Sequence, residues 1–292
     1  MIKKCIFIDV FTNSPYTGNP LAVFPESDNL NSFQMQLLAN EINYSETTFI
    51  SKNTSNDADF DIRIFTPKQE IPFAGHPAIG TAFTIAKVLK VWSGSGNTIK
   101  LKTKVGIIPL EFMENTIWME QNKPEFLKSY DNKQLIAELV GLNAEDVSDD
   151  LPIEEVTTGN KILILPVKKL SSIQRAFGNS DKLESFFKQS GCLAPYLFSR
   201  ETLEAKNHIH SRFFAPHLGI IEDPATGSAA GPLIGYLLKY DVFGDKFEII
   251  NEQGYEIKRP SLIFMRGKRV GNNFSVNIGG ECAYIGNGEF DI

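Results

Sequence analysis

A seven-residue phrase occurs twice in this sequence and constrains the fold more than any other feature. His76–Ala82 reads His-Pro-Ala-Ile-Gly-Thr-Ala, and Asp223–Ala229 reads Asp-Pro-Ala-Thr-Gly-Ser-Ala. The second copy begins 147 residues after the first (223 − 76), about half of the 292-residue chain. An apolar run with helical spacing follows each copy. The sequence therefore predicts two equivalent halves, each with a helix that begins at this phrase.

Two further matches extend the correspondence. Phe65 and Phe214 each begin a Phe-x-Pro segment, and Phe49 corresponds to Phe198, in both cases at an offset of 149 (214 − 65 and 198 − 49). Each half then reads as helix, strand, strand ending in Phe-x-Pro, loop and helix. Duplicated domains of this size predict a ligand site where the halves meet.

Alternating and helical apolar patterns occur side by side, which predicts an α+β chain. Helices are expected from Ser32 as the cap to about Asn43, at Lys133–Val140, and at Lys182–Gln189 with Ser180 as the cap. Strands are expected at Cys5–Phe11, Leu21–Phe24, Thr48–Ser51, Phe60–Phe65, within Thr98–Gln121, at Lys161–Val167, Tyr196–Ser199 and His208–Phe214, and from Phe247 onward.

The length exceeds what one core usually serves, so two domains are expected. The chain becomes polar around Lys123–Tyr130, and we place the boundary there. The prediction is a first domain of residues 1–122, which the last strand (residues 281–292) can join, and a second domain of residues 123–280.

Charge and cysteine usage narrow the class of protein. A net charge of −6, without a lysine or arginine cluster, argues against nucleic acid or an anionic membrane as partner. The three cysteines (Cys5, Cys192 and Cys282) are scattered and form no disulfide framework or CxxC pair, which indicates a reducing compartment. No stretch is long and apolar enough to cross a bilayer. We expect a cytoplasmic protein.

The repeated phrase also supplies candidate ligand groups. Its second residue is proline, which suits the first position of a helix, so His76 and Asp223 are the predicted N-caps. Gly75, Gly227 and Ser228 would place open backbone N–H groups at helix starts, where they can hold a carboxylate. If the two helix starts converge, His76 and Asp223 face each other across a cleft. The alternatives are that Asp223 is only a cap and that the glycines only allow a turn or close packing.

Glu46 is the candidate acid–base group. It stands between a helix end and a strand, flanked by Ser45 and Thr47. Burial among apolar residues disfavours the charged form of a carboxyl and suits it to proton transfer at neutral pH. At an offset of 149 its mate is Pro195, so only one half carries this group, which favours a single residue that takes and returns a proton. The alternative is a surface glutamate at a strand start.

Other signals predict no metal and no nucleotide. His208 and His210 have the spacing of a metal pair on one strand, but no third ligand is near in the sequence. The chain has neither the glycine pattern of a phosphate loop nor that of a dinucleotide fold.

These motifs resemble the PhzF family, named after the isomerase of phenazine biosynthesis. The segments that match, in order, are Asp9–Phe11 with Thr17–Val23, Ser45–Thr47, Gly75–Ala82 and Asp223–Ala229. The resemblance implies a diaminopimelate epimerase-like fold: two pseudo-symmetric domains, each a curved mixed sheet around a central helix, with the active site between them.

The resemblance also implies a cofactor-free isomerase, in which Glu46 shuttles a hydrogen between carbons of a dihydro-hydroxyanthranilate-type substrate. The positions that match those orienting the substrate are His76, Asp223, Gly75, Gly227 and Ser228, and Ser45 beside Glu46 joins them as a substrate-binding candidate. Related epimerases and proline racemases use two cysteines at the helix starts. No cysteine of this chain lies there.

The substrate is left open as a small carboxylated molecule, cyclic or amino-acid-like. Two alternatives share the fold: an inactive small-molecule binding or interaction protein, and an epimerase- or racemase-type enzyme. A Glu46 side chain enclosed beside His76 favours catalysis, whereas an exposed one favours binding. Nucleic acid and membrane are not expected as partners, and a homodimer is the assembly considered.

Overall fold

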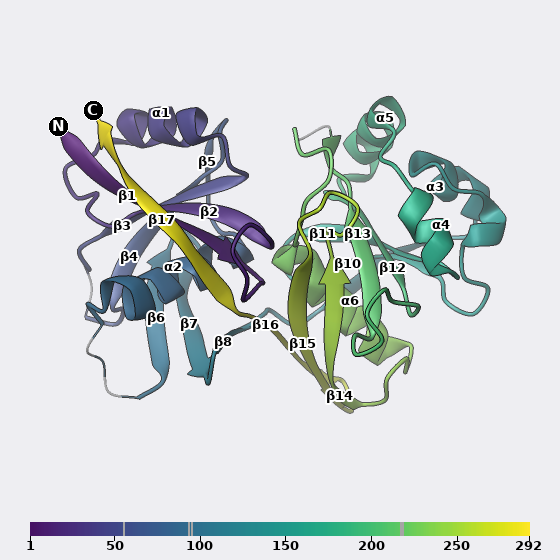
Figure 1. The fold of residues 1–292 in the computed structure, drawn as a ribbon. Coiled ribbons are helices and arrows are strands. Elements are labelled where there is room, and N and C mark those ends of the chain that lie inside the picture. The colour runs from purple at the N-terminus through teal and green to yellow at the C-terminus, as the bar shows by residue number, and fades with distance from the viewer. Residues whose placement is uncertain (55, 93, 95, 217–218) are drawn as a thin grey trace. The chain divides into compact units, whose positions relative to one another are not determined.

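The chain divides into two compact units. The computed structural model describes residues 1–292 apart from 55, 93, 95 and 217–218. One unit comprises Met1–Met119 and Gly279–Ile292, and the other Glu120–Ile278. The last strand, β17 (Cys282–Asp291), pairs with the first, β1 (Ile2–Val10), so both ends of the chain belong to the first unit (Figure 1). Among the described residues, no helix combines the length and the apolar composition that crossing a membrane requires.

The first unit contains a mixed sheet. Its pairings give the order β17, β1, β2, β3, β4, β6, β7, β8, and the short β5 (Glu70–Ile71) also pairs with β4. β2–β3 and β4–β6 are parallel, and the other neighbours are antiparallel. The bounds are β2 (Asn19–Phe24), β3 (Glu46–Ser51), β4 (Phe60–Phe65), β6 (Thr98–Thr103), β7 (Gly106–Met113) and β8 (Thr116–Glu120).

The second unit repeats this pattern of pairing. Its order is β9, β10, β11, β12, β13, β14, β15, and here β11–β12 and β13–β14 are the parallel pairs. The bounds are β9 (Glu125–Tyr130), β10 (Ile153–Thr157), β11 (Lys161–Pro166), β12 (Ala194–Ser199), β13 (Ile209–Phe213), β14 (Lys246–Gln253) and β15 (Ser261–Val270); β16 (Asn273–Gly280) follows. The duplication predicted from the sequence is therefore present in the topology.

Helices make the crossovers that parallel neighbours need. In the first unit α1 (Ser32–Ile42) joins β2 to β3, and α2 (Gly75–Phe83) with the π-helical η1 (Thr84–Leu89) lies between β4 and β6. In the second unit α4 (Leu170–Arg175) and α5 (Ser180–Ser190) join β11 to β12, and α6 (Gly227–Lys239) lies between β13 and β14. The remaining pieces are α3 (Lys133–Leu139) and the 3₁₀ turn η2 (Ala144–Asp146).

The helix that follows each phrase is the central helix of its unit. α2 packs on β1, β2, β3, β6 and β7, and α6 packs on β10, β11 and β15 (Figure 1). Every residue from Gly75 to Ala82 is buried. A Cβ at Gly80 would lie 2.7 Å from the side chains of Leu21 and Val10, so only glycine lets the helix approach the sheet this closely.

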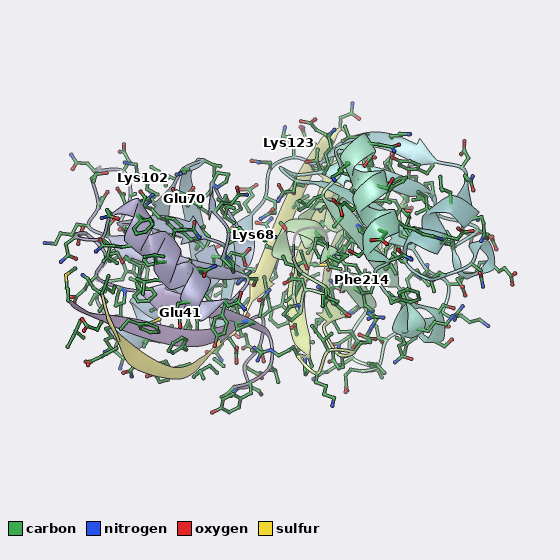
Figure 2. The ribbon with its side chains drawn as sticks, turned by 90° about the horizontal axis from the view of Figure 1, so that it is seen from above. Glu41, Lys68, Glu70, Lys102, Lys123 and Phe214 are labelled. Carbon is green, nitrogen blue, oxygen red and sulfur yellow. The ribbon has the colours of Figure 1, made fainter. Side chains whose placement is uncertain are left out.

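Three of the matched phenylalanines belong to the cores on the sheet faces away from the central helices, whereas Phe198 packs on Tyr236 of α6. Phe49 and Phe65 pack with the helix α1 in one cluster, and Phe214, labelled in Figure 2, belongs to the cluster under α3, α4 and α5. Strands β12 and β13 are buried along their whole length because both faces of the sheet are covered there.

The two helix starts differ from the prediction. The N-cap of α2 is Ala74, so His76 lies in the first turn; α6 begins at Gly227 with Thr226 as its N-cap, three residues after Asp223. The predicted caps His76 and Asp223 are thus wrong. Hydrogen bonds to Asp223 and Thr226 hold the chain before α6 in a non-helical conformation.

Two other caps are also shifted by one residue. Asn31 caps α1 in a capping box with Gln34, in place of Ser32, and Asn179 caps α5, in place of Ser180. Asparagine accepts the N-terminal N–H groups as well as serine does, so the sequence alone does not separate them.

Candidate active site

Glu46 is the first residue of β3 and follows the end of α1. Asn43 ends α1 in the left-handed conformation (φ 55°), and two residues later Ser45 Oγ donates a hydrogen bond to Asn19 Oδ1 at 3.3 Å. In the parallel ladder Glu46 stands opposite Leu21 of β2. Only 14% of its side chain is exposed. The alternative of an exposed surface glutamate therefore does not describe Glu46.

His76, in the first turn of α2, contacts this carboxylate. Its Nε2 lies 3.4 Å from Glu46 Oε2, and 7% of the His76 side chain is exposed. Burial lowers the pKa of His76 to about 3. The distance fits an ion pair, but the buried imidazole is neutral at pH 7, so the contact joins a neutral ring to a carboxyl group. The positive N-terminal end of the α2 dipole also disfavours the protonated form of His76.

The His76 ring nitrogen has capacity for a further partner. Among the described residues, Nε2 of His76 is buried without a hydrogen bond of good geometry. Buried polar groups in native proteins are almost always satisfied, so this nitrogen is available to a further hydrogen-bond partner, either a water molecule or a ligand group. Gly75 is the first residue of α2, and its N–H has no partner within the helix.

Asp223 lies before α6 in the second unit. It is 6% exposed, its N–H donates to Phe213 O at 3.1 Å, and its Oδ2 accepts a hydrogen bond from Thr226 Oγ1 at 2.5 Å. Gly227 and Ser228 are the first two residues of α6, whose N–H groups the helix itself leaves open.

The predicted residues thus form two groups. Ser45, Glu46, Gly75 and His76 belong to the first unit, and Asp223, Gly227 and Ser228 to the second. Within the first group the contact between Glu46 and His76 is direct. That both groups serve one ligand stays a prediction.

The cysteines do not supply a two-thiol mechanism. Cys5 lies in β1, Cys192 precedes β12 and Cys282 begins β17, so no cysteine is part of the start of α2 or of α6. Burial raises the pKa of Cys5 and of Cys192 to about 12, so both remain thiols at neutral pH.

The histidine pair of the sequence is split. His208 is exposed, whereas His210 is fully buried, with Nδ1 2.8 Å from Glu252 Oε1 and Nε2 3.0 Å from Glu256 Oε1. In the part of the chain that the structure describes, no group of three or more potential ligands is arranged to hold a metal.

Sequence reasoning missed the side chains around Asp223. Thr226, Gln253 and Tyr196 form hydrogen bonds with it or with each other. Thr226 had one visible signal, because it replaces Ile79 of the first copy. Gln253 and Tyr196 carry no such signal in the sequence, because β12 and β14 come near each other only through the order of strands in the folded sheet.

Comparison with known proteins finds relatives over the whole chain. The family pattern of phenazine biosynthesis-like proteins (PhzC-PhzF) matches residues 8–288. Trans-2,3-dihydro-3-hydroxyanthranilate isomerase of Pseudomonas chlororaphis is 34% identical over 289 residues, 97% of each chain. The uncharacterized isomerase YfhB of Bacillus subtilis (strain 168) is 31% identical over 281 residues, 94% of each chain.

Comparison with solved structures finds the same family. The crystal structure of a PhzF family phenazine biosynthesis protein of Bacillus anthracis superposes with a TM-score of 0.91 at 30% identity, over 100% of both chains. A hydroxyproline epimerase of Agrobacterium vitis gives a TM-score of 0.65 at 9% identity, over 99% of this chain and 92% of the other, which shows a common fold alone. These neighbours confirm the predicted α+β, diaminopimelate epimerase-like fold.

Proposed function

The chain belongs to the family of phenazine biosynthesis-like proteins and is an isomerase of that family, and from this premise we propose that Glu46 moves a proton between two carbons of a small carboxylated substrate. The observation that carries the proposal is the contact of the enclosed Glu46 carboxyl with the neutral imidazole of His76. A group that takes and returns a proton works best where water is largely excluded.

In the proposed step one residue both removes the proton and returns it. The Glu46 carboxylate removes a proton from one carbon, the electron pair shifts through the substrate, and the carboxylic acid returns the proton to another carbon. No oxidant, reductant or cofactor is consumed. The equivalent strand of the second half, β12, begins with Ala194 and Pro195, and neither of these side chains can accept or donate a proton, so in this proposal one residue performs both transfers.

The other residues bind and orient the substrate in this proposal. His76 offers a hydrogen bond without adding a charge, since its ring is neutral. The open N–H groups at Gly75, Gly227 and Ser228 suit a carboxylate, while Asp223 accepts from a hydroxyl or amino group and Ser45 supplies a hydroxyl. A cytoplasmic location and a homodimer remain parts of the proposal, and light scattering tests the latter.

The experiment is a screen in D₂O. The first probe is trans-2,3-dihydro-3-hydroxyanthranilate, after the name of the Pseudomonas relative, followed by cyclic and amino-acid-like carboxylates. We expect an isomer of unchanged elemental composition, with deuterium at no carbon other than the one that receives the proton. Saturable binding of a probe without conversion of any would contradict the proposal and favour a binding protein.

A further inference from the structure

The side chain of Gln253, the last residue of β14, is fully buried and hydrogen-bonded at both ends of its amide. Its Nε2 donates to Asp223 O at 2.8 Å and to Thr226 Oγ1 at 2.9 Å. Its Oε1 accepts from Thr226 N at 3.2 Å and from Tyr196 Oη at 2.9 Å. The three residues that make these four hydrogen bonds all belong to the second unit.

The backbone fixes which way this amide points. The Thr226 N–H can only donate, and the Asp223 carbonyl can only accept. Rotating the amide by half a turn would place its NH₂ group against the Thr226 N–H and its oxygen against the Asp223 carbonyl oxygen, and neither pair can form a hydrogen bond. Glutamine therefore has one permitted orientation here.

That orientation fixes two hydroxyl groups in turn. Because Thr226 Oγ1 receives a hydrogen from Gln253, its own hydrogen is directed to Asp223 Oδ2, 2.5 Å away. Because Gln253 Oε1 is an acceptor, the Tyr196 hydroxyl donates to it. The Tyr196 oxygen accepts from Asn251 Nδ2 at 2.8 Å and from Ser211 Oγ at 2.9 Å.

These hydrogen bonds form a chain in which each residue donates to the next. Asn251 donates to Tyr196, Tyr196 to Gln253, Gln253 to Thr226, and Thr226 to Asp223. Aligned hydrogen bonds polarise one another, and a hydroxyl that donates to a carboxylate stabilises its charged form. Burial raises the pKa of the Tyr196 hydroxyl, which keeps that donor protonated.

We propose that Asn251, Tyr196, Gln253 and Thr226 are positioning residues for the isomerase reaction, whose hydrogen-bond chain holds Asp223 as an ionised acceptor for a hydroxyl or amino group of the substrate. The inference rests on the proposed function, which places Asp223 at the substrate. In the first half Ile79 stands at the position of Thr226 in the repeated phrase and has no hydrogen-bonding side-chain atom, so the last donor of the chain belongs to the second half.

The first test changes the last donor. Thr226→Val removes the hydroxyl and keeps the volume; Thr226 makes no side-chain cap to α6, so the helix start is preserved. The titration of the Asp223 carboxyl, followed by ¹³C NMR without substrate, should move up by about 1 to 2 pH units. Thr226→Ser should restore it. An unchanged titration in folded Thr226→Val would overturn the proposal.

The second test replaces the amide of Gln253 with a carboxyl group. In Gln253→Glu the protonated carboxylic acid can still donate a hydrogen bond to Thr226. The ionised carboxylate cannot donate, and it adds a negative charge beside Asp223. With trans-2,3-dihydro-3-hydroxyanthranilate as probe, kcat/KM should acquire a new limb that falls as pH rises. The matched control is Gln189→Glu, an exposed amide on α5, which should keep the wild-type profile. Identical pH profiles for the two variants would contradict the proposal.

The two readouts separate this inference from the proposed function. A shifted Asp223 titration in a protein that converts no probe would support the chain of donors and refute the reaction. Conversion by the wild type, with no shift in Thr226→Val, would support the reaction and refute the chain.

Discussion

Nε2 of His76 lies 3.4 Å from Oε2 of Glu46, which brings the first turn of α2 against the first residue of β3. The contact depends on two local features: the left-handed end of α1 at Asn43, and the close approach of α2 to the sheet at Gly80. Because burial keeps the imidazole neutral, His76 does not place a positive charge beside the Glu46 carboxyl group.

The charge state of His76 is the first prediction. Since its pKa is lowered to about 3, the ¹⁵N signals of the ring should remain those of a neutral imidazole from pH 8 to about pH 4.5. Selective ¹⁵N-histidine labelling with His76→Gln for assignment makes the measurement. A titration midpoint near 6.5, the ordinary value, would refute the neutral-ring account.

The same burial makes stability depend on pH. Below about pH 6.5 the unfolded chain protonates His76 and the folded chain does not, so the free energy of unfolding should fall by about 1.4 kcal/mol per pH unit on the way to pH 3. His76→Gln cannot titrate and should lose this part of the slope. Denaturant unfolding between pH 6.5 and 4 tests it, and equal slopes for the two proteins would contradict it.

His210 should act in the opposite direction. Burial alone lowers its pKa, but the hydrogen bonds to Glu252 and Glu256 outweigh burial and raise it. Its contribution to stability is then complete below about pH 6.5 and is lost as pH rises through the folded-state value. Thermal unfolding from pH 6 to 9 should show this loss in the wild type but not in His210→Gln. A loss of the same size in both would rule His210 out as its source.

Asp223→Asn separates binding from folding. Asp223 is not the cap of α6, and asparagine keeps an oxygen that can accept from Thr226, so Tm should change little. Conversion of the probe should nevertheless fall at least tenfold, because the negative acceptor is gone. Unfolding and turnover are measured on the same preparation. A wild-type rate would remove Asp223 from the proposed site.

Much of the fold was readable from the sequence because the duplication was visible in it. Phe49 and Phe198 are buried in the corresponding strands β3 and β12, Phe65 and Phe214 are buried at the ends of β4 and β13, and the repeated phrase leads into each central helix. The helix starts were wrong because proline at the second position was taken as the first residue of a helix. Near Asp223, hydrogen bonds from Thr226 and Gln253 outweigh that local preference.

The site was only partly readable. The enclosure of Glu46 and its contact with His76 bring together residues 30 positions apart (76 − 46), which the phrase alone could not relate. Gln253 and Tyr196 carry no local pattern, because their roles come from the order of strands in the sheet.

The proposed reaction depends on Glu46 as the group that carries the proton. Glu46→Gln keeps the side-chain volume and removes its acid–base capacity, and the matched control is Glu41→Gln, an exposed glutamate of α1 in the same unit (Figure 2). Both variants should fold like the wild type.

The deciding measurement is the rate of isomerisation of trans-2,3-dihydro-3-hydroxyanthranilate by the three proteins in H₂O and D₂O. For Glu46→Gln we expect the rate to fall by about 10²- to 10⁴-fold and any deuterium incorporation to be lost, whereas Glu41→Gln should behave like the wild type. A folded Glu46→Gln protein that converts the probe at the wild-type rate would contradict the proposed reaction.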